Sequence, residues 1–206
     1  MEEIYNIAGS LSVILLAIAL TIAISKYSAL AKNEKWYIYY IIFILFIESI
    51  SYSISFFEIV GARPVLYPIY IAGEFFLVTG IFLKKLKLPN YFFILTGILS
   101  LFFVTVDKIL PQYENDYSKA VSNSIIICLV AYSLIQEIKA YTNNSHFLAV
   151  DAMIFLYFTV SIFIFMFQYQ LLKFNLESFH ILWAINNVLI CILYSTFIYT
   201  FLKLKK

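Results

Sequence analysis

Two glutamates lie inside apolar stretches of this sequence, where a carboxylate is costly. Glu74 interrupts "YIAGEFFLVTG" (residues 70–80), and Glu48 interrupts "ILFIESIS" (residues 44–51). An ionisable side chain within hydrocarbon is a functional-site hypothesis by default. Burial and mutual repulsion both favour neutralisation of two such groups, by a proton on one of them or by a cation between them. These carboxylates are therefore the first candidates for binding a proton, a metal cation or an amine.

Other polar side chains recur at helical spacing in the same stretches and in the last apolar stretch. Residues three or four positions apart share one face of a helix, so each stretch presents a polar stripe. The predicted ligand-binding residues are Glu48, Glu74, Asn187, Tyr70, Ser51, Ser55, Asn186, Trp183 and Arg63.

The depth of these residues follows from the helical rise. Counted from the turn "EIVGARPVLYP" at about 1.5 Å per residue, Glu48 lies about 15 Å and Glu74 about 9 to 12 Å deep, and Asn187 lies about 12 Å below the start of its own stretch. We therefore expect Glu48, Glu74 and Asn187 to line one cavity that opens to the outside, with Arg63 near its mouth. Alternatively, Glu74 only bonds a neighbouring helix.

Composition identifies the elements that must hold these residues. Of the 206 residues, 63% are hydrophobic and only 13% are charged, and the mean hydropathy is +0.91. A soluble domain has roughly 45–50% apolar and about 25% charged residues. The chain is therefore expected to have the lipid bilayer as its main partner, and its net charge of +2 gives no support for nucleic acid as another.

Seven apolar stretches are separated by short polar connections, and about 20 such residues span a bilayer as a helix. Their limits are about 7–25, 36–57, 66–83, 90–106, 119–136, 147–171 and 179–202. The sequence predicts an all-α, seven-helix transmembrane bundle that forms one domain over residues 1–206, with no soluble domain. A shift of 112 residues aligns "SLSVILLAIALT" with "SNSIIICLVAYS", which is compatible with a parallel repeat of three helices, one linker helix and three helices.

The basic residues predict the orientation, because short cytoplasmic loops collect Lys and Arg. One side holds ten of them, Lys26, Lys32, Lys35, Lys84, Lys85, Lys87, Lys139, Lys203, Lys205 and Lys206, and the other holds four, Arg63, Lys108, Lys119 and Lys173. We expect a multi-pass protein of the inner (cytoplasmic) membrane with its N-terminus outside and its C-terminus in the cytoplasm.

The sequence lacks the residues that several kinds of functional site require. Cys128 and Cys191 lie within apolar stretches, and His146 and His180 fall at opposite faces of the membrane, so no metal-ligating cluster is predicted. The last stretch contains no lysine for a retinal Schiff base, and no glycine-rich phosphate loop is present. We expect no cofactor, and an enzyme is disfavoured.

Three motifs occur in order along the chain: "FIESIS", "LYPIYIAGEFF" and "LWAINNVLICILYS". Together they resemble a group of small seven-helix membrane proteins common in the Bacteroidota. This resemblance implies a seven-helix fold with an acidic feature in the second and third helices. It carries no activity and no ligand.

Three functions remain open from the sequence. The first is a sensor or binding module for a cation, an amine or another small ligand, which passes a signal to a membrane or cytoplasmic partner. The second is a small-molecule or proton-coupled transporter, and the third is an intramembrane lipid-modifying enzyme with Glu48 and Glu74 as acid and base. The absence of catalytic motifs and of a soluble output domain favours the first.

Overall fold

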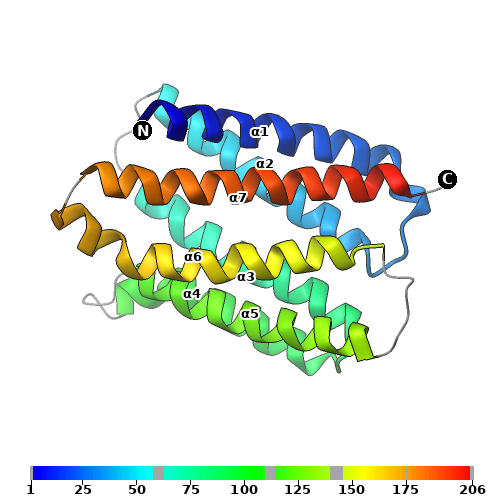
Figure 1. The fold of residues 1–206 in the computed structure, drawn as a ribbon. Helices are drawn as coiled ribbons and strands as arrows, with labels where there is room; N and C mark the ends of the chain where they lie inside the picture. Colours follow the sequence, from blue (N-terminus) through cyan, green and yellow to red (C-terminus); the bar gives the residue numbers. More distant parts are fainter. Residues whose placement is uncertain (1, 58–62, 110–114, 140–145, 175, 205–206) are drawn as a thin grey trace. The chain divides into compact units, whose positions relative to one another are not determined.

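The computed structural model describes residues 2–57, 63–109, 115–139, 146–174 and 176–204, with only the backbone described at some helix ends. Within these ranges the chain forms seven α-helices and one short 3-10 turn, η1 (Tyr27–Ala29), and no strand (Figure 1). The helices are α1 (Glu2–Ser25), α2 (Lys35–Phe56), α3 (Arg63–Lys85), α4 (Tyr91–Ile109), α5 (Asn115–Lys139), α6 (Leu148–Phe174) and α7 (Leu176–Lys203).

The predicted all-α membrane fold is confirmed. In the part of the chain that the structure describes, six helices, all except α4, are long and apolar enough to cross a membrane, which makes this a multi-pass membrane protein. The apolar part of α4 that the structure describes, Tyr91–Val106, is shorter, although the whole helix has 19 residues and a length of about 28 Å. Helices form here because lipid offers no partners to backbone N–H and C=O groups, so each segment must satisfy its own.

The helices group into two compact units. Unit 1 comprises Met1–Leu30 and Asn123–Lys206, and unit 2 comprises Ala31–Ser122, so α5 begins in unit 2 and continues in unit 1. The first helix thus joins the last three, which is not the grouping of the 3+1+3 plan. The internal repeat and the single domain both stay predictions.

Unit 2 is built on close packing of α2 against α3. Two glycines of α3 lie directly beneath aromatic rings of α2: Gly73 beneath Phe43 and Gly80 beneath Trp36. The Trp36 ring also packs at 6.2 Å from Phe76 of α3, measured between ring centroids. Gly73 and Gly80 are seven residues apart, two helical turns, so both lie on the face that meets α2. The two pairs show that α2 and α3 run antiparallel.

We expect Gly80→Ala to destabilise the protein, because the new Cβ would overlap the Trp36 ring and force it to move. Overpacking of this kind costs about 1–3 kcal/mol of unfolding free energy. Gly97→Ala in α4 is the matched control, since a Cβ there meets nothing within 4 Å. Thermal unfolding of the purified protein in detergent compares the two variants, and equal melting temperatures would contradict the packing.

Unit 1 places α7 beside both α1 and α6 (Figure 1). Ala8 and Lys26 of the N-terminal segment meet Cys191 and Leu204 respectively, so α1 and α7 run parallel. The Lys26 Nζ donates to the Leu204 carbonyl at 2.7 Å, where a cation meets the negative end of the α7 dipole. Phe165 of α6 packs edge-on against Trp183 of α7 at 5.7 Å between centroids.

Candidate functional site

Glu74 of α3 forms an ion pair with Lys119 of α5. The Lys119 Nζ donates to the Glu74 Oε2, and both side chains are buried, with 0% and 2% of their surface exposed. Both residues belong to unit 2. A buried carboxylate is tolerated when an opposite charge and hydrogen bonds satisfy it. This contact agrees with the alternative expectation that Glu74 bonds a neighbouring helix.

Tyr70 completes the group one helical turn before Glu74. Its hydroxyl donates to the Glu74 Oε1 at 2.9 Å and accepts from the Lys119 Nζ at 3.2 Å. The Lys119 Nζ also lies 4.4 Å from the centroid of the Tyr70 ring, within the range of a cation–π interaction. Both carboxylate oxygens of Glu74 are therefore hydrogen-bonded.

Lys119 was counted among the loop charges of the side with four basic residues, and this count was wrong. The helix α5 begins at Asn115, four residues earlier than expected, so Lys119 lies within it and is fully buried. Counting charges between apolar stretches treats any lysine at the end of a stretch as solvated, and no local pattern reveals a partner 45 residues away. Without Lys119 the basic residues divide ten against three, so the predicted orientation keeps its basis.

Glu48 lies in a cavity of about 250 Å³ between α2 and α3, within unit 2. The cavity is lined by Ile44, Ile47, Glu48, Ser51, Leu66, Tyr67 and Tyr70. Glu48 is partly buried, and no residue that the structure describes donates a hydrogen bond to its carboxylate or pairs with it. The Tyr67 and Tyr70 rings stack at 6.4 Å between centroids and 22° between planes. The site therefore combines one unpaired carboxylate with two aromatic rings.

The two glutamates are not at one level. The contacts of Gly73 with Phe43 and of Gly80 with Trp36 set the register of the antiparallel pair, and in this register Glu48 faces residue 68. Six residues separate that position from Glu74, which is about 9 Å along the axis. Part of this difference arises because α3 begins at Arg63 and not near residue 66, which adds three residues, or about 4.5 Å, to the depth of Glu74.

The structure brings some of the predicted residues together. Glu48, Ser51 and Tyr70 line the cavity, and Glu74 is attached to it through the hydroxyl of Tyr70. Ser55 is exposed and its hydroxyl donates to the Ser51 carbonyl at 3.0 Å, and it is not among the lining residues. Arg63 is the first residue of α3, and its side chain lies outside the described part.

The predicted residues of the last stretch belong to unit 1. Asn186 is buried, and Trp183 and Asn187 are partly buried. A Cβ on Gly9 of α1 would lie 3.6 Å from the Asn187 Nδ2, so Asn187 sits where α7 approaches α1. A cavity shared by Asn187 with Glu48 and Glu74 stays a prediction.

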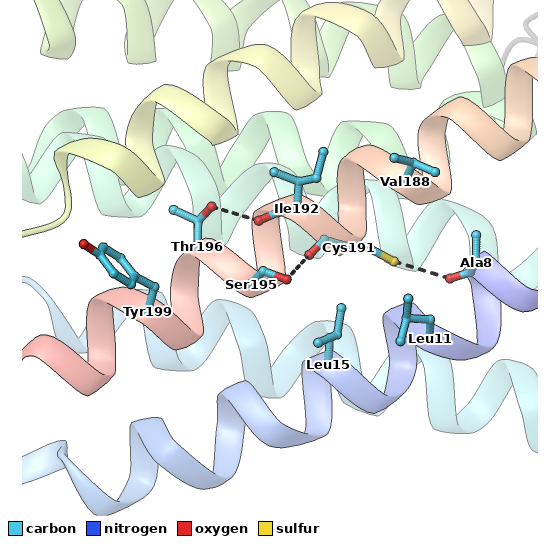
Figure 2. A pocket seen from close by; sticks show the side chains of 9 residues that line it. All are labelled: Ala8, Leu11, Leu15, Val188, Cys191, Ile192, Ser195, Thr196 and Tyr199. Carbon is cyan, nitrogen blue, oxygen red and sulfur yellow. Dashed lines mark hydrogen bonds between the residues drawn. The ribbon is translucent and has the colours of Figure 1, made fainter.

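A second cavity, of about 460 Å³, lies between α1 and α7 in unit 1 (Figure 2). It is lined by Ala8, Leu11, Leu15, Val188, Cys191, Ile192, Ser195, Thr196 and Tyr199. The hydroxyls of Ser195 and Thr196 each donate at 2.8 Å to a carbonyl one turn earlier in α7. The Cys191 Sγ lies 3.5 Å from the Ala8 carbonyl. Because these hydroxyl and thiol groups already have hydrogen-bond partners, the cavity presents a mostly apolar surface.

No family model, no curated protein and no solved structure matches this chain. The resemblance to small seven-helix proteins of the Bacteroidota therefore stays an expectation.

Proposed function

We propose that this protein is a cation-binding membrane module whose site is the Glu48 cavity and whose preferred ligand is a small organic ammonium ion. The observation that carries the proposal is the Glu48 carboxylate, which is partly buried and has no partner among the described residues. A carboxylate in such a place favours a proton or a cation beside it.

The lining of the cavity supports an ammonium ion over a metal ion. Aromatic faces attract organic cations, and Tyr67 and Tyr70 supply two rings next to the carboxylate. In the part of the chain that the structure describes, no three His, Cys, Asp or Glu side chains gather as metal ligands. A volume of about 250 Å³ is below the roughly 300–1,000 Å³ of sites for drug-sized ligands, which favours a smaller ligand.

The state of Glu74 weakens the enzymatic alternative. An acid–base pair needs two carboxylates that can exchange protons with a substrate, whereas Glu74 is ion-paired with Lys119 and hydrogen-bonded to Tyr70. Of these two carboxylates, only Glu48 is then available for proton exchange with a substrate. A transporter of the same cation stays an alternative proposal, which flux of the ligand into liposomes would select.

The cellular setting belongs to the same proposal. The ten-to-three bias of basic residues supports an orientation with the N-terminus outside, and in an inner-membrane protein of this orientation the cavity would lie in the outer half of the membrane. A ligand would then enter from outside, and a membrane or cytoplasmic partner would receive the signal.

Binding of tetramethylammonium by the full chain in lipid nanodiscs tests the proposal. Two unit charges 4 Å apart attract by about 4 kcal/mol at an effective dielectric constant of about 20, and desolvation offsets part of this energy. We expect Glu48→Gln to weaken binding at least tenfold, because a loss of about 1.4 kcal/mol already gives that factor. Calorimetric titration measures the affinity.

The matched control is Ser55→Ala, which changes the same helix two turns from Glu48 and outside the cavity. It should leave the affinity within about twofold, since a surface change away from the site contributes at most about 0.5 kcal/mol. If the wild-type protein does not bind the probe saturably, or if folded Glu48→Gln binds it equally well, the proposal is refuted.

A further inference from the structure

Unit 1 contains a second group of polar side chains that the Glu48 cavity does not use. Asn123 of α5 and Ser161 of α6 are fully buried, and the Asn123 Nδ2 donates to the Ser161 Oγ at 3.2 Å. Asn186 of α7 is 4% exposed. We call Asn123, Ser161, Trp183 and Asn186 the polar layer of unit 1.

The packing of α6 against α7 brings these residues to one level. Phe165 contacts Trp183, and the two consecutive helices run antiparallel, so Ser161 lies one turn along α6 from that contact and Asn186 lies about one turn along α7 in the same direction. Trp183 and Asn186 are three residues apart, so they lie on the same face of α7. Asn123 reaches this level through its hydrogen bond to Ser161.

Three polar atoms of this layer are buried and have no hydrogen-bond partner among the described residues. They are the Asn123 Oδ1, the Asn186 Oδ1 and the Trp183 Nε1. Two are acceptors and the third is a donor. Leaving a buried polar atom unpaired destabilises a protein, and within a bilayer there is no surrounding solvent to compensate.

We propose that the polar layer binds a neutral hydroxyl group, either a water molecule or the hydroxyl of a small solute. A hydroxyl ligand donates to an amide oxygen and accepts from the indole N–H, and a water molecule can donate to both amide oxygens and still accept from the indole. A bare cation cannot accept a hydrogen bond from the indole N–H. An anion cannot donate a hydrogen bond to the two amide oxygens. The mixed set therefore selects a neutral ligand, and buried waters typically make about three such bonds. This site is independent of the proposed cation site in unit 2.

The indole proton of Trp183 reports on the ligand. The chain has two tryptophans, so selective ¹⁵N-indole labelling of the full chain in nanodiscs gives two signals, and the spectra of Trp183→Phe and Trp36→Phe each identify them. We expect magnetisation transfer between a hydroxyl or water proton and the Trp183 indole proton. Asn186→Leu should shift the indole resonance and abolish the transfer, because it removes one of the ligand's partners.

Asn90→Leu, in the connection between α3 and α4, is the control that should leave the Trp183 resonance unchanged. Addition of glycerol separates the two sources of the hydroxyl. A saturable shift of the indole resonance identifies a solute site, and transfer from water that glycerol does not alter identifies a water site. If neither transfer nor a glycerol-dependent shift is observed, the proposal is refuted.

Stability provides an independent measurement if a signal is too broad to detect. With a bound hydroxyl, Asn186→Leu should lower the melting temperature, since it removes one partner of the ligand and leaves the others unpaired. In a dry layer, an apolar side chain of similar shape in place of Asn186, whose Oδ1 has no partner among the described residues, is neutral or stabilising. An unchanged or raised melting temperature of Asn186→Leu would therefore contradict a bound ligand.

Discussion

Lys119→Met should be among the most destabilising single substitutions in this protein, with a loss of about 3–5 kcal/mol of unfolding free energy. The change removes the cation that pairs with Glu74 and leaves a carboxylate with 2% of its surface exposed. Breaking a buried ion pair from one side costs more than removing both partners, because the remaining charge keeps its full desolvation penalty. Unfolding by denaturant in detergent micelles, followed by circular dichroism, measures the loss.

The double variant Glu74→Gln/Lys119→Met distinguishes the pair from other effects of Lys119. With both charges removed, stability should recover most of the loss, since replacing a buried pair by neutral groups is often neutral or favourable. Lys139→Met is the matched control, because Lys139 lies in the last turn of the same helix and is exposed. Additive losses in the double variant would show that the two residues do not stabilise each other.

The fold was largely predictable because the bilayer reduces the available structures to a few. Each apolar stretch had to form a helix, and the observed ends of all seven helices lie within a few residues of the predicted ones. The division into two units could not be foreseen. It depends on which helix faces meet, for example where the Phe43 ring packs over Gly73. The pattern of apolar residues does not reveal these faces, because large apolar side chains lie on both buried and exposed faces of the helices.

The candidate site was predictable in its residue types but not in its pairings. Glu48, Ser51 and Tyr70 were identified from polarity at helical spacing, and they do line one cavity. Lys119 was missed because it stands at the edge of its apolar stretch, where lysines are normally solvated. A signal did exist: an apolar stretch with an unexplained carboxylate requires a cation, and Lys119 is one of few basic residues near an expected outer helix end.

Asn123 and Ser161 were missed for another reason. Single serines and asparagines in membrane helices commonly hold helices together, so their presence alone distinguishes no site. They are identified only by the tertiary structure, in which the Asn123 Nδ2 donates to the Ser161 Oγ and the Asn123 Oδ1 has no partner among the described residues.

Tyr70 joins the cavity to the ion pair, so Tyr70→Phe should separate stability from binding. The variant loses a hydroxyl that donates to Glu74 at 2.9 Å and accepts from Lys119 at 3.2 Å, and it keeps the ring. Hydrogen bonds to charged groups contribute about 1.5–3 kcal/mol each, and partial compensation between the two suggests a total loss of about 3 kcal/mol. The same unfolding experiment used for Lys119→Met measures this loss.

Binding of tetramethylammonium to Tyr70→Phe should change by less than about threefold, because a phenyl face attracts a cation nearly as well as a phenol face. Tyr67→Phe is the matched control: it keeps the second ring of the cavity and leaves every donor to Glu74 in place, so it should be the more stable variant. A Tyr70→Phe protein as stable as the wild type would show that the hydroxyl does not support the ion pair. Loss of binding in Tyr70→Phe but not in Tyr67→Phe would instead make the hydroxyl a ligand contact, and the cation would then interact with the Glu74–Lys119 pair as well as with Glu48.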